Sequence, residues 1–191
     1  MAQPGEITAI TGANASGKSS LIYALSGVIP QSIKADLQGA IWLGETNLRE
    51  LPLCEIYRYM SVGLSDTAMQ LLLPTCELEL AFALENMGLP PEKIRQRITA
   101  AVVEFKLEGL LNQDPQSLSG GEQRLLLFAI CLAMQNPILL LDEPESGLSP
   151  ASLNLLCSWL TRLKANAQII ILATHDEQLI QLSDQQINLD R

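Results

Sequence analysis

The sequence predicts an α/β fold with a mostly parallel sheet. Short apolar runs, which are typical of buried strands, alternate with segments of helical periodicity along most of the 191 residues. The first of these runs, residues 6–11, leads directly into a glycine-rich stretch that opens a helix. Residues 74–124 contain no convincing strand and predict an all-helical insertion into the alternating pattern.

Five runs predict strands. They are "EITAIT" (6–11), "GAIWLG" (39–44), "YMSVGL" (59–64), "PILLLDEP" (137–144) and "AQIIILATHD" (167–176). The last two contain continuous stretches of apolar residues, as expected for strands that are covered on both faces. Acidic residues end the fourth run, and the single histidine of the chain lies at the end of the fifth.

Capping residues predict where two helices begin or end. The helix that follows the first strand continues through "LIYALSG", with Gly27 as its C-terminal cap. A second helix begins after Pro74 at Thr75, whose hydroxyl suits an N-cap, and ends at Gly88.

Periodicity predicts two further helices. The helix after "LPPEK" has apolar residues at helical spacing, namely Ile94, Ile98, Ala101, Val102 and Phe105. Ser149 and Pro150 suit the N-cap and first position of the other helix. The apolar face expected for it consists of Leu156, Trp159, Leu160 and Leu163.

Composition excludes several classes of protein. Apolar residues make up 48% of the chain and charged residues 17%, which indicates a packed globular protein rather than a disordered one. The net charge of −9 argues against a nucleic-acid-binding surface built on basic residues. The longest apolar run, residues 125–134, is about half of the roughly 20 residues that span a bilayer as a helix. No secretory leader opens the chain, so we expect an intracellular protein.

The cysteines carry no recognisable chemistry. Cys54, Cys76, Cys131 and Cys157 are far apart and form no C-x-x-C pair. We therefore expect buried, reduced thiols rather than zinc ligands or disulfides.

A complete phosphate-binding pattern, the Walker A motif, lies between the first strand and its helix. "GANASGKS" consists of Gly12, four residues, and then Gly17, Lys18 and Ser19. Backbone N–H groups of such a loop surround nucleotide phosphates, and the helix N-terminus adds favourable partial charge. We expect the lysine to reach the β- and γ-phosphates and the Ser19 hydroxyl to bind Mg²⁺. The predicted nucleotide-binding segment consists of Gly12, Ala13, Asn14, Ala15, Ser16, Gly17, Lys18, Ser19 and Ser20.

The acidic end of "ILLLDEP" supplies two further candidate residues. The carboxylate of Asp142 lies where a Walker B aspartate would hold Mg²⁺. Glu143 is placed to position or deprotonate the attacking water. These two acids and the phosphate loop together predict a hydrolytic nucleotide site.

A second glycine-rich stretch, "SLSGGEQR", has two interpretations. Ser119 and Glu122 have the spacing of a capping box, and this alone would start the helix "QRLLLFAICLAM". A hydroxyl and two glycines at a helix N-terminus also suit an anion. The residues alone favour neither interpretation.

The order of these motifs resembles that of the ATP-binding cassette (ABC) ATPases. "LSGGEQ" matches the signature of that family and lies between Walker A and "LLLDEP", and a later strand closes with the histidine of "LATHD". The resemblance implies a P-loop NTPase (RecA-like) core at 1–73 and 125–191, with a helical signature subdomain at 74–124. It also implies that ATP is hydrolysed, with Lys18, Glu143 and His175 as catalytic residues.

The resemblance further implies a dimer. In this family two cassettes pair head to tail, and each ATP lies between Walker A of one cassette and the signature of the other. Ser119, Gly120, Gly121 and Glu122 would then approach the γ-phosphate held by the partner, which is a second copy of the chain or a sister ATPase. His175 matches the switch histidine that contacts the same phosphate.

Residues 27–48 and 71–94 look most like the energy-coupling-factor (ECF) group of importers. This implies an ATPase at the cytoplasmic face of the membrane, bound to an integral-membrane subunit and powering the uptake of a vitamin or metal ion. Its cofactors would be ATP and Mg²⁺, and no nucleic acid is expected. The alternatives are a soluble, non-transport ABC ATPase, or a degenerate nucleotide-binding subunit with little turnover.

Three departures from the family pattern bear on these expectations. No adenine-stacking aromatic precedes Pro4, which implies either a truncated N-terminal β-subdomain or weak binding of adenine. The Q-loop glutamine expected after "VGL" is missing, which leaves Gln70 or Asp66 as replacements. Ser149 occupies the position of the usual D-loop aspartate.

Overall fold

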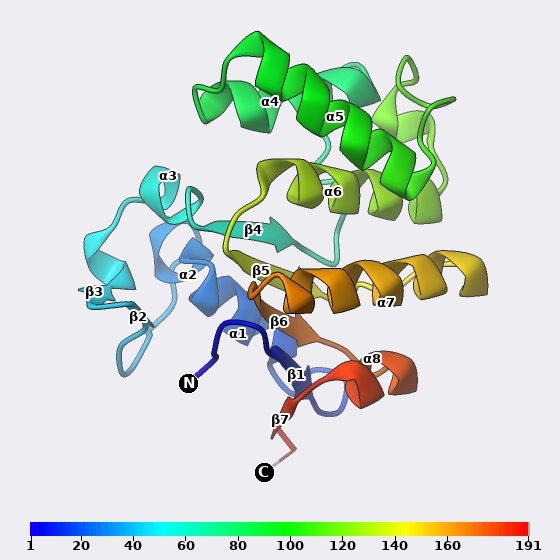
Figure 1. Ribbon diagram of the computed structural model, residues 1–191. Helices are drawn as coiled ribbons and strands as arrows, with labels where there is room; N and C mark the ends of the chain where they lie inside the picture. Colours follow the sequence, from blue (N-terminus) through cyan, green and yellow to red (C-terminus); the bar gives the residue numbers. More distant parts are fainter. Residues whose placement is uncertain (191) are drawn as a thin grey trace.

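The computed structural model describes residues 1–190 and places five strands in one parallel sheet, in the order β4-β5-β6-β1-β7 (Figure 1). Every neighbouring pair is parallel. The C-terminal ends of the strands therefore lie at one edge, where open α/β sheets bind ligands. The bounds are β1 (Ile7–Thr11), β4 (Met60–Gly63), β5 (Ile138–Asp142), β6 (Ile169–Ala173) and β7 (Gln185–Asn188).

Four of the five strands lie within predicted runs, but β7 was not predicted. All four residues of β7 are exposed, and the strand reads "QQIN". It is nevertheless paired along β1 from Thr8↔Gln185 to Thr11↔Asn188. Backbone pairing at the edge of a sheet requires no apolar pattern, so hydrophobic periodicity gave no indication of this strand.

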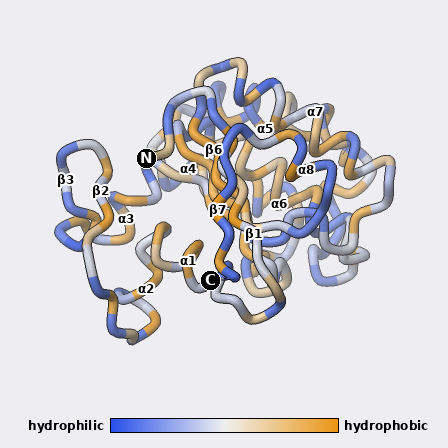
Figure 2. Tube along the Cα trace, turned by 90° about the horizontal axis from the view of Figure 1, so that it is seen from below, coloured by the Kyte–Doolittle hydropathy of each residue, from blue (hydrophilic) through white to orange (hydrophobic). Residues whose placement is uncertain are grey.

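The predicted strand at 39–44 is wrong in its extent and its sheet. Only β2 (Trp42–Leu43) forms there, and it pairs antiparallel with β3 (Thr46–Asn47) in a separate two-stranded ribbon. Gly44, with φ at +61°, lies in the turn between them. Figure 2 shows this hairpin and α3 on the side of the molecule away from α7 and α8.

Eight α-helices and two 3₁₀ turns are present within residues 1–190. The helices are α1 (Lys18–Leu25), α2 (Val28–Gln31), α3 (Leu53–Ile56), α4 (Cys76–Asn86), α5 (Pro91–Phe105), α6 (Gly120–Met134), α7 (Pro150–Ala165) and α8 (Glu177–Leu182). The 3₁₀ turns are Leu48–Glu50 and Pro115–Ser117.

The predicted caps are present. Thr75 Oγ1 accepts a hydrogen bond from Leu78 N at 3.3 Å and begins α4, and Gly88 adopts φ +71° just after the end of that helix. Ser149 Oγ accepts from Ser152 N at 3.2 Å and begins α7. At the end of α1, Gly27 lies one residue beyond the capping residue, with φ at +79°.

The segment 74–124 contains α4, α5 and the beginning of α6. Figure 1 shows α4 and α5 on the side of α6 that faces away from the sheet. Helix α6 is continuous from Gly120 to Met134, so the proposed boundary at residue 124 falls inside this helix. The insertion and the core that contains the sheet therefore share one continuous helix.

Two hydrophobic clusters hold the layers together. The larger one contains the aromatic residues Phe105, Phe128 and Trp159, whose ring centroids are 5.3 to 6.1 Å apart. These rings come from α5, α6 and α7, so they join the insertion to the core. The smaller cluster includes Ile22 of α1 and Leu140 of β5, on the other face of the sheet.

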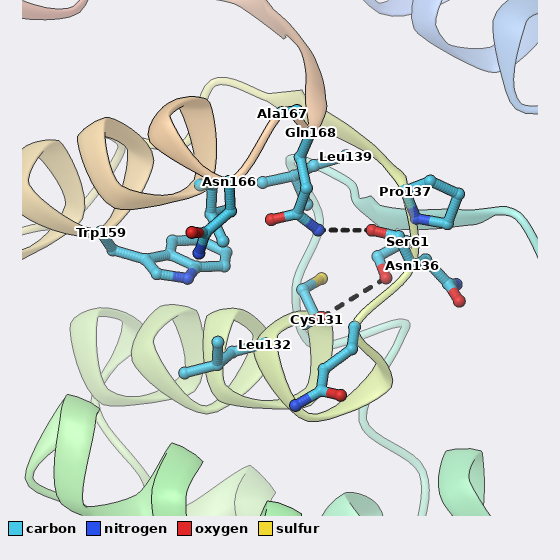
Figure 3. A pocket seen from close by; sticks show the side chains of 12 residues that line it. Ser61, Cys131, Leu132, Asn136, Pro137, Leu139, Trp159, Asn166, Ala167 and Gln168 are labelled. Carbon is cyan, nitrogen blue, oxygen red and sulfur yellow. Dashed lines mark hydrogen bonds between the residues drawn. The ribbon is translucent and has the colours of Figure 1, made fainter. Parts of the chain in front are cut away.

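A cavity of about 410 Å³ lies at the N-terminal edge of the sheet, between the ends of α6 and α7 (Figure 3). Trp159 lines it, and the indole nitrogen of this side chain is buried without a hydrogen-bond partner. The lining residues are Ser61, Cys131, Leu132, Gln135, Asn136, Pro137, Leu139, Trp159, Leu163, Asn166, Ala167 and Gln168. None of the predicted nucleotide-site residues is among them.

The four thiols are free, and three of them follow the prediction at least in part. Cys76 and Cys131 are buried, and burial raises the pKa of the Cys131 thiol to about 12. Cys157 is half-buried. Cys54 is exposed, contrary to the prediction, because the single turn of α3 buries Ile56 instead.

Candidate functional site

The phosphate loop connects β1 to α1 in a shape that only glycine fits at its first position. Gly12 has φ at +148°, and a Cβ on it would lie 2.6 Å from Ser16 Oγ. Ala15 also has a positive φ, at +64°, which is costly for a residue with a side chain. The loop therefore keeps a strained, open conformation, as binding loops often do.

Lys18 lies across this loop instead of extending into solvent. It is 4% exposed, and its Nζ donates to Gly12 O at 2.9 Å and to Ala13 O at 3.0 Å. The ammonium group is thus held at the mouth of the loop by two backbone carbonyls. A phosphate that enters the loop would find a cation already in position.

The loop has a further support that the sequence did not indicate. Asp190 Oδ1 accepts a hydrogen bond from Ala13 N at 2.6 Å, and Leu189 N donates to Thr11 O at 2.9 Å. These contacts follow from the pairing of β7 with β1. A residue 177 positions away in the sequence therefore anchors the start of the phosphate loop.

Asp142 and Ser19 meet at the C-terminal end of β5. Asp142 is fully buried, and its Oδ1 accepts a hydrogen bond from Ser19 Oγ at 3.0 Å. Its other carboxylate oxygen, Oδ2, is buried and has no hydrogen-bond partner. A buried carboxylate oxygen without a partner is costly, and a hydroxyl beside it provides a second oxygen ligand. These residues fit a magnesium ion.

Glu143 and His175 face each other beside this pair. His175 Nε2 lies 3.7 Å from Glu143 Oε1. The Glu143 backbone has φ at +47°, and its N–H donates to Ala173 O at 2.9 Å. Strained backbone at a polar cluster is a common feature of functional sites.

Glu145 was not predicted, yet it holds the histidine segment. Its Oε1 accepts from Thr174 Oγ1 at 2.7 Å and from His175 N at 3.1 Å. The same oxygen lies 4.0 Å from His175 Nε2. No motif distinguishes this glutamate from a surface residue, because its partners are about 30 positions further along the chain.

These elements surround a cavity of about 530 Å³. The lining residues are Asn14, Ala15, Gly17, Lys18, Ser19, Ser20, Glu143 and His175. The structure thus brings the predicted phosphate loop, the candidate water-activating acid and the histidine together. The volume falls within the range of small-molecule sites.

The signature residues do not line this cavity. Ser119 and Gly120 are exposed at the start of α6. Ser119 Oγ accepts from Glu122 N at 3.3 Å, and Glu122 Oε2 accepts from Ser119 N at 2.9 Å, which completes the predicted capping box. Hydrogen bonds from the Ser119 side chain and backbone lower the pKa of the Glu122 carboxyl. The stretch is therefore a helix cap in this chain, and its exposed end remains free for another molecule.

Gly121 is required for packing within the chain. A Cβ on it would lie 2.9 Å from the backbone oxygen of Gly147. The first turn of α6 therefore packs directly against the segment that follows β5. Gly121 of the signature and Gly147 after β5 are 26 residues apart in sequence, and their backbones are in contact.

The two replacements considered for the missing glutamine are placed differently. Gln70 is half-buried; its Oε1 accepts from Leu64 N at 2.7 Å and its Nε2 donates to Val62 O at 3.1 Å. Its amide is thus used to shape the loop after β4. Asp66 is exposed, and its Oδ1 accepts from Met69 N at 3.4 Å. Only Asp66 keeps a side chain available for other partners.

This chain is similar to known ATP-binding proteins of ABC transporters. The ABC transporter family model matches residues 1–146. A Geobacter sulfurreducens protein provisionally named as an ABC transporter ATP-binding protein is 34% identical over 92% of this chain and 68% of its own. The energy-coupling factor transporter ATP-binding protein EcfA of Methanococcus maripaludis is 31% identical over 94% of this chain and 63% of its own.

A solved structure agrees with these relatives. It is cbiO1 from Clostridium perfringens, described as part of the ABC transporter complex cbiONQ. The TM-score is 0.79 at 28% identity, covering 97% of this chain and 73% of that one. The chain spans about two thirds of the length of the curated relatives that it matches.

Proposed function

This chain belongs to the ABC transporter family of ATP-binding proteins, and we propose that it binds and hydrolyses ATP to drive an importer of the ECF type. The observation that carries the proposal is the meeting of Lys18, Glu143 and His175 around one cavity, beside Ser19 and the buried Asp142. Lys18, Glu143 and His175 each come from a different motif, and the sheet brings the three motifs together.

The phosphate-binding roles follow from the polar atoms of the loop. The amides of Gly12 to Ser20 surround the phosphates, and Lys18 moves its ammonium group from the loop carbonyls to the phosphate oxygens. Ser19 and Asp142 would hold Mg²⁺, which would neutralise charge on the phosphate oxygens. Glu143 orients the attacking water, and His175 approaches the γ-phosphate.

The partner cassette is proposed from the exposed signature. An anion-binding helix start that lies outside its own nucleotide cavity is available to a second molecule. Ser119, Gly120, Gly121 and Glu122 cap the γ-phosphate held by the partner. ATP then closes the dimer, and hydrolysis reopens it.

An apolar surface patch supports a membrane-subunit partner. The docking patch consists of Met69, Leu72, Leu78 and Phe82, which are 48% to 78% exposed. Leu78 and Phe82 lie four residues apart on α4 and so share one face. Apolar side chains exposed on one face of a helix and on the loop that leads into it indicate an interaction site.

Hydrogen bonds connect the loop that carries part of the docking patch to the segment just before the signature. Gln116 Nε2 donates to Ala68 O at 3.2 Å and to Leu71 O at 2.7 Å. A subunit bound at the patch would therefore move the segment that leads into α6. Within residues 1–190, none of the helices combines the length and apolarity needed to cross a bilayer, and a separate polytopic subunit would form the membrane passage.

The decisive experiment is Glu143→Gln. We expect ATP binding to be retained, steady-state phosphate release to fall by about 100-fold or more, and ATP to trap a closed dimer. Phosphate release and light scattering with ATP and Mg²⁺ measure these effects. Glu104→Gln, which changes a half-exposed carboxylate paired with Arg162 on the far side of the fold, is the matched control. Turnover at the parental rate in Glu143→Gln would refute the assigned role.

A subunit with little turnover is the second candidate, because the amide of Gln70 is used within its own loop. These two candidate functions are distinguished by steady-state phosphate release, measured for the chain alone and with solubilised membrane partners. Turnover that a polytopic partner stimulates supports the transporter ATPase. Nucleotide binding without turnover under both conditions supports the degenerate subunit.

A further inference from the structure

A buried arginine links the signature helix to the loop after β4. Arg124, on the second turn of α6, is 5% exposed. Its Nη1 donates to Leu64 O at 3.0 Å and its Nη2 to Ser65 O at 2.9 Å. The same loop continues to Met69 and Leu72 of the docking patch. Any displacement of this loop therefore acts on the guanidinium group.

The Nε donor of this guanidinium has no partner. Arg124 Nε is buried and makes no hydrogen bond. Burial lowers the pKa of the Arg124 guanidinium, and among the nearby carboxylates Glu145 opposes this most strongly, followed by Asp142. A buried cation with an unused donor is costly and favours a conformation in which the donor is paired.

Glu145 is the complementary group. Its Oε1 is occupied by Thr174 Oγ1 and His175 N, but its Oε2 is buried without a partner. Gly121 and Gly147 bring the two residues close, because their backbones touch where α6 meets the segment after β5. An unpaired donor and an unpaired acceptor of opposite charge thus lie on either side of the contact between α6 and the segment after β5.

We propose that Arg124 and Glu145 are positioning residues that form an ion pair when the nucleotide-bound dimer closes, and so connect the docking patch to His175. The connection runs from the loop after β4 through Arg124 to Glu145, and from there to the backbone of His175. This connection would take the place of the Q-loop glutamine, which the chain lacks. The inference rests on the proposed ATPase function.

The test is a double-mutant cycle on the full chain with ATP and Mg²⁺. Glu145→Gln keeps an acceptor for Thr174 and His175 but removes the charge, and Arg124→Lys keeps the charge but not the fork of donors. We expect each variant to lower kcat by about tenfold with KM for ATP within about twofold. The double variant should be no slower than either single variant, because both remove the same pair.

A second readout follows His175 directly. Hydrogen exchange of peptides containing this residue, with and without a non-hydrolysable ATP analogue, should show a gain in protection in the parent. Both variants should lose that gain although Arg124 is far from His175 in sequence. Thermal unfolding confirms that each variant is folded.

The controls are Arg97→Lys and Glu79→Gln. Arg97 also donates to two backbone carbonyls of α6, at the opposite end, and Glu79 is also a buried carboxylate that accepts a backbone N–H. Both should keep the parental protection gain and kcat. The proposed ion pair would be refuted if the two losses in kcat were additive. It would also be refuted if either test variant kept the parental gain in protection from hydrogen exchange. A parent chain that binds no nucleotide would overturn the proposed function and the pair together.

Discussion

The two glycine-rich stretches of this chain resemble each other in sequence but differ in what completes them. The phosphate loop is completed within the chain, because Lys18 donates to two of its carbonyls and Asp190 accepts a hydrogen bond from the amide of Ala13. The signature stretch is satisfied only as a helix cap, through Ser119 and Glu122, and its glycine end is exposed. The first stretch forms its site within one chain, whereas the second would be half of a site in the dimer that we propose.

The largest expected effect lies in the phosphate loop. Lys18→Ala removes a positioned cation, and charge-assisted hydrogen bonds of about 1.5–3 kcal/mol each should be lost, so ATP affinity should fall by roughly 10- to 100-fold or more. Equilibrium binding of a fluorescent ATP analogue measures this. Lys34→Ala, on an exposed loop, is the control. Unchanged affinity in Lys18→Ala would place the phosphates elsewhere.

The next largest effect distinguishes the signature stretch from the phosphate loop. Ser119→Arg should leave ATP binding by the monomer within about twofold but abolish ATP-dependent dimerisation, because a bulky cation fills the interface. Sedimentation with a non-hydrolysable analogue and Mg²⁺ measures dimerisation. Ser119→Ala removes the capping hydroxyl, at about 1 kcal/mol of stability, but adds no bulk, so it should weaken dimerisation less than Ser119→Arg does. Loss of ATP binding by the Ser119→Arg monomer would contradict an intermolecular role.

A smaller effect tests packing beneath the signature. Gly121→Ala forces a Cβ to within 2.9 Å of the Gly147 oxygen, and backbone atoms cannot move aside cheaply. We expect the free energy of unfolding to fall by about 1–3 kcal/mol, measured by urea denaturation. Gly120→Ala, where nothing lies within 4 Å of the added carbon, is the control. Equal stability of the two variants would refute the close contact.

The smallest effect concerns strain in the first stretch. Ala15 adopts φ +64°, a left-handed conformation that costs less for glycine than for alanine. Ala15→Gly should therefore stabilise the fold by about 0.5–1 kcal/mol, because the greater conformational entropy of glycine in the unfolded chain cancels only part of this gain. Urea denaturation measures this as well. Ala2→Gly, at a half-buried position without a positive φ, is the control and should not stabilise. A destabilised Ala15→Gly variant would show that the loop is not strained at this residue.

Contiguous motifs predicted much of the candidate site. Walker A, the acidic end of β5 and the histidine after β6 were each readable within about ten residues, because strand, turn and helix signals there are local. Their meeting in one cavity followed from the parallel sheet, which places all strand ends at one edge. The capping box at Ser119 was likewise a local pattern.

Glu145 and Arg124 could not be predicted in the same way. Neither belongs to a spacing rule that distinguishes it from an ordinary charged residue. Arg124 contacts carbonyls about 60 positions earlier in the chain, and Glu145 binds a hydroxyl and an amide about 30 positions later. Such partners become neighbours only after the helices and strands have packed.

By itself the sequence determined the alternation of strands and helices, the phosphate loop and the family, because periodicity and short-range spacing act within a few residues. Only the tertiary structure decided the exposed strand β7, the support of Ala13 by Asp190 and the contact of Gly121 with Gly147. Backbone pairing at a sheet edge and backbone-to-backbone packing depend on where the chain returns in space, and no side-chain pattern encodes that.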